Sequence, residues 1–165
     1  MGHKNLPMEK KKRIALVAHD NTKSDMVAWA KDNNQRLAHH ELFATGSTGK
    51  QLEDALETEI HTLTSGPLGG DQQIGAKITE GEIDFLIFFW DPLTSLPHDP
   101  DVRALLRMAV LWNVPVACDR ASADFMITSP LMDEEYQRLL TEQIDSGEHR
   151  RLLLHQMERR ESGDS

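Results

Sequence analysis

The sequence predicts an α/β protein whose parallel sheet carries helices on both faces. Two runs, residues 14–18 and 85–90, are apolar throughout and end at polar residues. Runs of this kind, without alternation, are typical of strands that are covered on both sides. Shorter apolar runs span residues 42–44, 114–117 and 125–127. Helical patterns lie between these runs, and strands that alternate with helices indicate a parallel sheet.

Three helices are predicted between the strands. Apolar side chains recur at helical spacing over residues 26–37 and 102–109. A third helix is expected over residues 71–80, because Gly81 suits the position at the end of a helix. After Pro130 the sequence becomes charged, and we expect one or two C-terminal helices with a frayed end.

The chain has 165 residues, a length typical of one domain. We expect a polar lead-in over residues 1–12, a folded domain over 13–145 and a charged extension over 146–165. The basic cluster at residues 10–13 could be a nucleic-acid arm, but a solvated lead-in to the first strand is the favoured interpretation.

Composition narrows the class of protein. The net charge of −9 argues against nucleic acid and anionic lipid as partners. No apolar run approaches the roughly 20 residues that span a bilayer. Cys118 is the only cysteine, which excludes an intramolecular disulfide and a zinc site built on several cysteines. A reducing cytoplasm and a buried, inert thiol are therefore expected.

Polar residues gather where the predicted strands end. His19, Asp20 and Lys23 follow the first strand, a Gly-, Ser- and Thr-rich loop at residues 45–49 follows the second, and Asp91 follows the 85–90 run. The carboxyl ends of parallel strands meet at one edge, and ligands bind in the crevice beyond it. The sequence therefore predicts one site at this edge.

The loop at residues 45–50 resembles part of a nucleotide-binding P-loop. That motif needs glycine where Ala44 stands and a hydroxyl residue where Gln51 stands, so we reject it. The loop still suits a phosphate, because backbone N–H groups and hydroxyls would open a helix there. The alternative is a helix cap by Ser47 or Thr48.

A second Gly-rich loop, residues 65–70, leads into Asp71. Its small residues permit close approach of the backbone to a ligand. Asp71 is either an N-cap, which would lower its pKa, or a base, which would need burial or neighbouring carboxylates. His98 is either a hydrogen-bonding imidazole or part of the entry turn of a helix. The eight histidines include no His-x-His and no His-Glu-x-x-His, so no metal site is predicted.

The segments 17–20, 44–49, 65–73, 88–92 and 97–101, in this order, closely resemble the methylglyoxal synthase family. Segments 112–116 and 123–125 fit as well, so the resemblance covers about residues 12 to 132. It implies a three-layer α/β/α fold with a mainly parallel five-stranded sheet, usually assembled as a homohexamer. It also implies a lyase, with its catalytic domain over residues 13–145, that converts dihydroxyacetone phosphate to methylglyoxal and inorganic phosphate without metal or organic cofactor.

The resemblance also assigns roles to residues. Asp71 is the expected proton donor and acceptor, with Asp20, Asp91 and Asp101 as supporting carboxylates. The expected substrate contacts are His19, Lys23, Thr45, Gly46, Ser47, Thr48, Ser65, Gly66 and His98. Ser47 stands where threonine is common, and it keeps the hydroxyl.

Chemistry makes sense of these residue types. A base removes a proton from the substrate, and His98 is the candidate hydrogen-bond donor to the enediolate. Lys23, Ser65 and the loop would hold the phosphoryl group in a rotamer from which phosphate leaves. Inhibition by phosphate is a family trait, for which Arg150 is a candidate.

An alternative class remains open from the sequence. The same fold also serves as a regulatory module that binds phosphate or a nucleotide without turnover. The Gly-Gly-Asp71 segment and the His98–Asp101 segment favour the enzyme.

Overall fold

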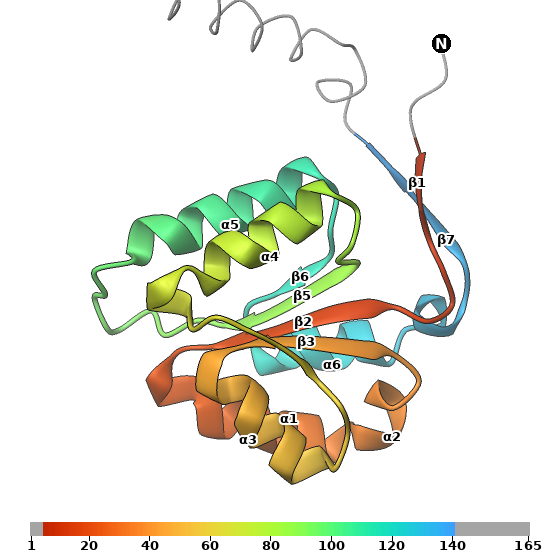
Figure 1. Ribbon diagram of the computed structural model, residues 1–165. Coiled ribbons are helices and arrows are strands. Elements are labelled where there is room, and N and C mark those ends of the chain that lie inside the picture. The colour runs from red at the N-terminus through yellow and green to blue at the C-terminus, as the bar shows by residue number, and fades with distance from the viewer. Residues whose placement is uncertain (1–4, 141–165) are drawn as a thin grey trace, which may run out of the picture.

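The computed structural model describes residues 5–140, and a five-stranded sheet forms its centre (Figure 1). The strand order is β4-β3-β2-β5-β6, and every neighbouring pair is parallel. The strands are β2 (Arg13–Ala18), β3 (Glu41–Thr45), β4 (His61–Leu63), β5 (Phe85–Phe89) and β6 (Val116–Ala117). The predicted α/β class and the five-stranded sheet are confirmed.

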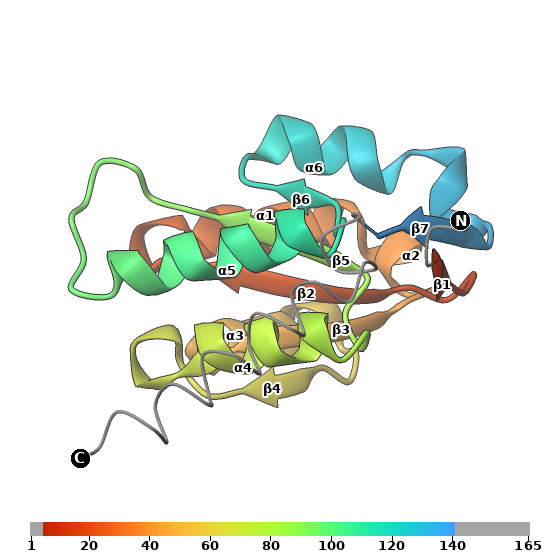
Figure 2. The same ribbon diagram turned by 90° about the horizontal axis from the view of Figure 1, so that it is seen from above.

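Helices cover both faces of this sheet and give three layers. The helices are α1 (Lys23–Asp32), α2 (Asn34–Leu37), α3 (Gly46–Leu56), α4 (Gly70–Thr79), α5 (Asp99–Leu111) and α6 (Arg120–Ile127). In Figure 1, α4 and α5 lie above the sheet, and α1, α3 and α6 lie below it; Figure 2 shows the same molecule from above. Three short 3₁₀ turns complete the chain: η1 (Asp20–Thr22), η2 (Gly66–Leu68) and η3 (Pro130–Asp133).

Side chains that alternate between the two faces of the strands divide the hydrophobic core into two clusters, one on each face of the sheet. In β2, Ile14 and Leu16 pack with α1, α3 and α6, whereas Ala15 and Val17 pack with α4 and α5. Successive side chains of a strand point to opposite faces, so an entirely apolar strand needs cover on both sides. All four residues are at most 2% exposed.

The predicted strand over residues 125–127 is wrong, because this segment is the end of α6. Asp119 caps that helix by accepting a 2.7 Å hydrogen bond from the backbone N–H of Ser122. Ala123 and Ile127, four residues apart, are buried, while Phe125 is 82% exposed. The spacing of the buried residues is helical, and a run of three apolar residues was too short to reveal it.

Two further boundaries differ from the prediction. β5 ends at Phe89, and Trp90 is 41% exposed. The expected helix over residues 26–37 is two helices, α1 and α2, separated at Asn33. Gly81 does follow the end of α4 in a left-handed conformation, with φ of +73°.

A two-stranded antiparallel sheet was not predicted. β1 (Asn5–Met8) pairs with β7 (Tyr136–Leu139), so part of the expected polar lead-in is a strand. The expectation of a helix after Pro130 is wrong for the described residues, which form η3 and β7. The partner strands lie far apart in the sequence, so no local pattern reveals their pairing. The extension over residues 146–165, including Arg150, lies outside the described residues.

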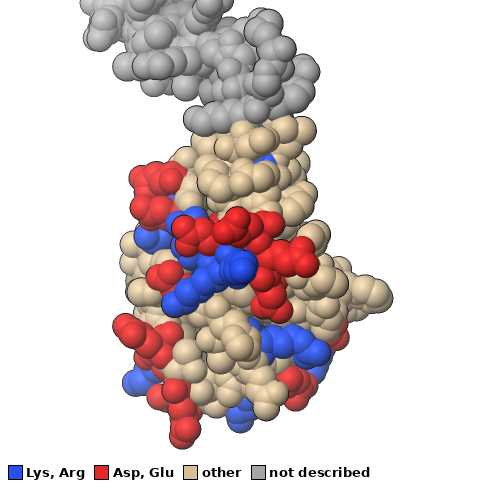
Figure 3. Space-filling view, turned by 90° about the vertical axis from the view of Figure 1, so that its right-hand side faces the viewer, with Lys and Arg blue, Asp and Glu red and all other residues tan. Residues whose placement is uncertain are grey.

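The basic cluster at residues 10–13 is not wholly solvated. Lys12 is fully buried, and its ammonium donates to the backbone carbonyls of Glu9 and Glu134. Lys12 therefore ties the start of β2 to the segment before β7. Figure 3 shows the face at the amino ends of the strands, where acidic and basic side chains are interspersed.

Two other expectations concern Cys118 and the membrane. The thiol of Cys118 is partly buried rather than fully buried. Burial raises its pKa, and the neighbouring Asp119 adds to this effect, which makes the thiol a weak nucleophile. Within residues 5–140, no helix has the length and apolar character needed to cross a bilayer.

Candidate active site

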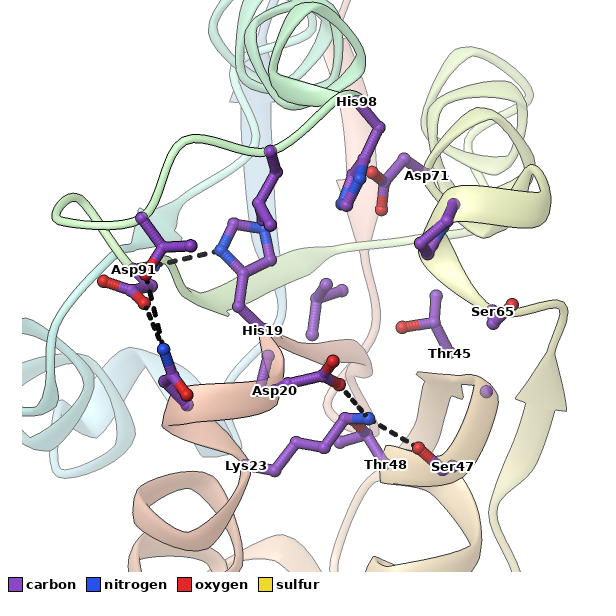
Figure 4. Close-up of a pocket in the computed structure, with 18 residues that line it drawn as sticks. His19, Asp20, Lys23, Thr45, Ser47, Thr48, Ser65, Asp71, Asp91 and His98 are labelled. Carbon is purple, nitrogen blue, oxygen red and sulfur yellow. Dashed lines mark hydrogen bonds and ion pairs between the residues drawn. The ribbon is translucent and has the colours of Figure 1, made fainter.

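A cavity of about 430 Å³ opens at the carboxyl ends of the central strands (Figure 4). Every predicted site residue except Asp101 lines it. These residues are His19, Asp20, Lys23, Thr45, Gly46, Ser47, Thr48, Ser65, Gly66, Asp71, Asp91 and His98. The prediction that the polar strand ends would meet at one edge is therefore confirmed by their positions.

The cation of the cavity is the ammonium of Lys23. Its Nζ lies 2.7 Å from Oδ1 of Asp20 and donates to Oγ of Ser47 at 2.6 Å. The Asp20 side chain is 93% exposed, and the hydrogen bond from Lys23 holds the pKa of Asp20 below its usual range. Lys23 therefore bridges the end of β2 to the start of α3.

The N-terminus of α3 faces the same cavity. Thr45 occupies its N-cap position, and no side chain caps the helix. Ser47 binds Lys23 and Thr48 is buried, so the alternative of a cap by Ser47 or Thr48 is wrong. The first N–H groups of a helix have no partner within the helix, and together with the helix dipole they form a site for an anion.

Glycines bring the two Gly-rich loops into contact. Gly46 has a φ of +50°, and a Cβ atom there would lie 2.8 Å from Cβ of Ser65. A Cβ atom on Gly70 would overlap the carbonyl oxygen of Thr64 and would lie 2.9 Å from Cγ2 of Thr45 in the other loop. The loops can approach this closely only without side chains at both positions.

Asp71 is not the cap of α4. The helix begins at Gly70, with Gly69 in the N-cap position at φ of +113°, so Asp71 lies inside the first turn. Its side chain points into the cavity next to His98, and the residue is only 3% exposed (Figure 4). Burial raises the pKa of Asp71, His98 opposes this effect, and the charge of Asp101 adds to it. The carboxylate is consequently a stronger base than an exposed aspartate.

Asp101 acts on the site from outside its lining. It is half-buried in the first turn of α5, and its backbone N–H donates to the carbonyl of His98. Neither Asp20 nor Asp91 contributes to the raised pKa of Asp71. Of the three carboxylates expected to support Asp71, Asp101 is the one whose charge raises the pKa of Asp71, and the supporting roles of Asp20 and Asp91 stay predictions.

His19 is a buried imidazole with one ring nitrogen engaged. Its Nδ1 accepts a 3.1 Å hydrogen bond from the backbone N–H of Asp91, and its Nε2 is buried without a partner among the described residues. Burial lowers the pKa of His19, and His98 lowers it further. The ring of His98 stands edge-on to that of His19, with centroids 5.7 Å apart.

The carboxylate of Asp91 is occupied by hydrogen bonds from its own loop and from η1. It accepts hydrogen bonds from the backbone N–H of Leu93 at 3.0 Å and from Nδ2 of Asn21 at 2.9 Å. Hydrogen bonds from Thr94, Asn21 and Leu93 keep the pKa of Asp91 low. Sequence reasoning missed Asn21 and Thr94, because nothing in the linear pattern distinguishes them from other polar loop residues.

Within residues 5–140, no group of three or more His, Cys, Asp or Glu side chains is arranged as a set of metal ligands. The polar groups that line the cavity are hydroxyls, two imidazoles, the ammonium of Lys23 and three carboxylates, of which Asp71 and Asp91 are buried. Fold and site together define an α/β protein in which a helix N-terminus without a side-chain cap and a buried carboxylate of raised pKa share one cavity.

Comparison with known proteins assigns the chain to a family. The family model described as an MGS-like domain matches residues 25–118. The methylglyoxal synthase of Cellvibrio japonicus is 55% identical over 85% of this chain and 91% of its own length. That of Coxiella burnetii is 59% identical over 76% of this chain and 87% of its own length.

A solved structure agrees with the sequence relatives. The methylglyoxal synthase of Elizabethkingia anophelis superposes with a TM-score of 0.81 at 48% identity, over 85% of this chain and 92% of that one. The chain belongs to the methylglyoxal synthase family. Membership of this family indicates that the chain is an enzyme.

Proposed function

We propose that the chain is a lyase that converts dihydroxyacetone phosphate to methylglyoxal and inorganic phosphate. One observation carries the proposal: a buried carboxylate of raised pKa, Asp71, shares a small cavity with the N-terminus of α3 and the ammonium of Lys23. A phosphorylated ketone needs both features, a base for its acidic C–H bond and a cationic site for its phosphate.

The phosphoryl group binds at the open end of the cavity. The Nζ of Lys23 already lies 2.6 Å from Oγ of Ser47, which is in the first turn of α3. The present partner of Lys23, Asp20, is exposed, so a phosphate dianion can take its place without leaving a buried charge unpaired.

Asp71 removes a proton from the hydroxymethyl carbon. The electron pair of that C–H bond forms a carbon–carbon double bond, and the carbonyl oxygen becomes an enediolate oxygen. His98, beside Asp71, and the Nε2 of His19 are the hydrogen-bond donors for the developing negative charge. Desolvation by the cavity strengthens these hydrogen bonds.

Elimination follows from the enediolate. The proton of the remaining hydroxyl passes to the enediolate oxygen, and the oxygen that loses it forms an aldehyde carbonyl. The electron pair of the carbon–carbon double bond moves to the bond beside the phosphate-bearing carbon, the bond between that carbon and the phosphate oxygen breaks, and phosphate leaves with its electron pair and the proton held by Asp71. The enol that remains takes up a proton at its terminal carbon and becomes methylglyoxal. The breaking bond must stand out of the enediolate plane, and a grip on the phosphate by Lys23 and α3 would hold it there.

One assay tests the activity. The protein is incubated with dihydroxyacetone phosphate and a chelator, and methylglyoxal and phosphate are measured; we expect them in equal amounts. Binding of substrate without product would refute the lyase and support the phosphate-binding regulatory module. Product that disappears on chelation would refute the expectation that no metal is needed.

Lys23→Ala tests the phosphate grip. Loss of a charge-assisted hydrogen bond of about 1.5–3 kcal/mol should raise the KM for the substrate by at least about tenfold. Lys50→Ala is the matched control, because Lys50 is exposed on α3 and does not line the cavity. An unchanged KM in the Lys23 variant would exclude its contact with phosphate.

A homohexamer, a cytoplasmic location and inhibition by phosphate stay predictions from the resemblance. Large apolar side chains on the surface support assembly: Val110 is 75% exposed and Phe125 82% exposed. Light scattering on a sizing column would measure the mass, and a monomer at micromolar concentration would contradict the hexamer.

A further inference from the structure

One wall of the cavity is a loop at residues 90–98, which joins β5 to α5. It contributes Asp91, Thr94, Leu96 and His98 to the lining. Two side chains of η1 hold the start of this loop. Thr22 Oγ1 donates to the carbonyl of Phe89 at 2.6 Å, and Asn21 Nδ2 donates to the loop itself.

Asn21 reaches two side chains of the loop. Its Nδ2 lies 2.9 Å from Oδ2 of Asp91 and 3.3 Å from Oγ1 of Thr94. The other carboxylate oxygen of Asp91 accepts from the backbone N–H of Leu93. Both oxygens of Asp91 therefore fix the shape of the loop, and the contact of Asp91 with the site is made by its backbone.

That backbone contact decides the protonation of His19. An amide N–H can only donate, so the Nδ1 of His19 must present its lone pair to Asp91. In the neutral ring the proton is then on Nε2, which is buried without a partner among the described residues. A ring with the proton on Nδ1 would present a lone pair at Nε2 and could not donate to an oxyanion.

We propose that Asn21 is a positioning residue that clamps the loop at Asp91, so that the Asp91 amide holds His19 as a donor through Nε2. The proposal deepens the proposed function and rests on it, because it concerns the hydrogen bond that His19 gives to the enediolate. Asn21 itself does not need to touch the substrate.

The test is Asn21→Ala, with Ser95→Ala as the matched control. Ser95 is exposed in the same loop and does not line the cavity. We expect kcat to fall by about tenfold, since loss of one fully aligned oxyanion donor costs about 10²–10³ and the clamp is removed only in part. KM should stay within about twofold, because Lys23 and α3 are untouched.

A spectroscopic readout separates positioning from general damage. Nitrogen-15 chemical shifts of His19 report which ring nitrogen carries the proton. The wild-type chain should show the form protonated on Nε2, and Asn21→Ala should show a mixture of both forms. Unchanged shifts, or a raised KM with an unchanged kcat, would overturn the proposal.

A double-mutant cycle supplies a second measurement. If Asn21 and Asp91 act through one clamp, Asn21→Ala should add little to the loss in kcat caused by Asp91→Ala. Additive losses would overturn the proposal, because they assign Asp91 a separate role. If the wild-type chain forms no methylglyoxal, the proposed function fails, and the nitrogen-15 measurement still decides whether Asn21 sets the form of His19.

Discussion

Asp71→Asn should inactivate the protein and stabilise it at the same time. The amide has nearly the shape of the carboxylate, so the cavity is kept, but it cannot take up a proton. General acid–base catalysis is worth about 10²–10⁴ in rate, and Asp71 is the proposed base, so we expect kcat to fall by about 10³ or more.

The gain in stability follows from burial. Asp71 is 3% exposed and burial raises its pKa, so the ionised carboxylate costs free energy in the folded chain. A raised folded pKa means that stability is highest below the unfolded pKa of about 3.9 and is lost as pH rises toward the folded value. Each unit of difference is worth about 1.4 kcal/mol, and about 1 kcal/mol shifts the Tm of a domain of this size by about 3 °C.

Thermal denaturation followed by circular dichroism between pH 4 and pH 8 measures this effect. At pH 7 the Asp71→Asn variant should melt above the wild-type chain, and the difference should shrink toward pH 4, as the carboxyl group becomes protonated in the folded chain. An equal or lower Tm at pH 7, or a difference independent of pH, would refute the argument from burial. Wild-type turnover would refute the role of Asp71 as base.

Three further substitutions follow from single contacts. Gly66→Ala places a methyl group 3.4 Å from Oδ1 of Asp71, so kcat should fall by about tenfold while the Tm changes little. An unchanged kcat would show that the reaction does not use the side of the carboxylate that faces Gly66. Gly70→Ala cannot be accommodated without moving the backbone carbonyl of Thr64, so urea denaturation should show that the free energy of unfolding falls by about 3 kcal/mol. A decrease of less than about 1 kcal/mol would contradict the rigidity of the loop. Asp84→Ala removes the carboxylate that accepts two hydrogen bonds from the Arg13 side chain, so the free energy of unfolding should fall by about 2–3 kcal/mol while kcat is unchanged. A change in kcat would contradict a purely structural role for the pair.

The sequence predicted the centre of the fold better than its edges. β2 and β5 are continuous apolar runs because helices cover them on both faces, and this pattern is local. β4 at the sheet edge exposes His61 and Thr62, so it carries no such signal. β1 and β7 were missed because each strand depends on a partner more than 120 residues away, as in the pair Asn5 and Leu139.

The sequence predicted which residues line the cavity, but not the local contacts that those residues make. Strand ends predicted which residues meet, because the carboxyl ends of parallel strands share an edge. Whether Asp71 caps α4 depends on a shift of two residues in the start of the helix, which the Gly69-Gly70 pair leaves open in the sequence. The hydrogen bond from the Asp91 amide to His19 joins the residues that follow the neighbouring strands β5 and β2, so no spacing along the chain reveals it.

Under the proposed function, the charges of the cavity predict the direction in which the substrate binds. Burial disfavours charge at the inner end, which raises the pKa of Asp71 and lowers that of His19. The inner end therefore holds a strong base and a neutral donor, and neither attracts a phosphate dianion. Lys23 lies at the outer end, where its partner Asp20 is solvated. Under the proposed function, we expect phosphate to bind outermost and the reacting carbon innermost, so that phosphate leaves toward solvent while the enediolate stays in the desolvated part of the cavity.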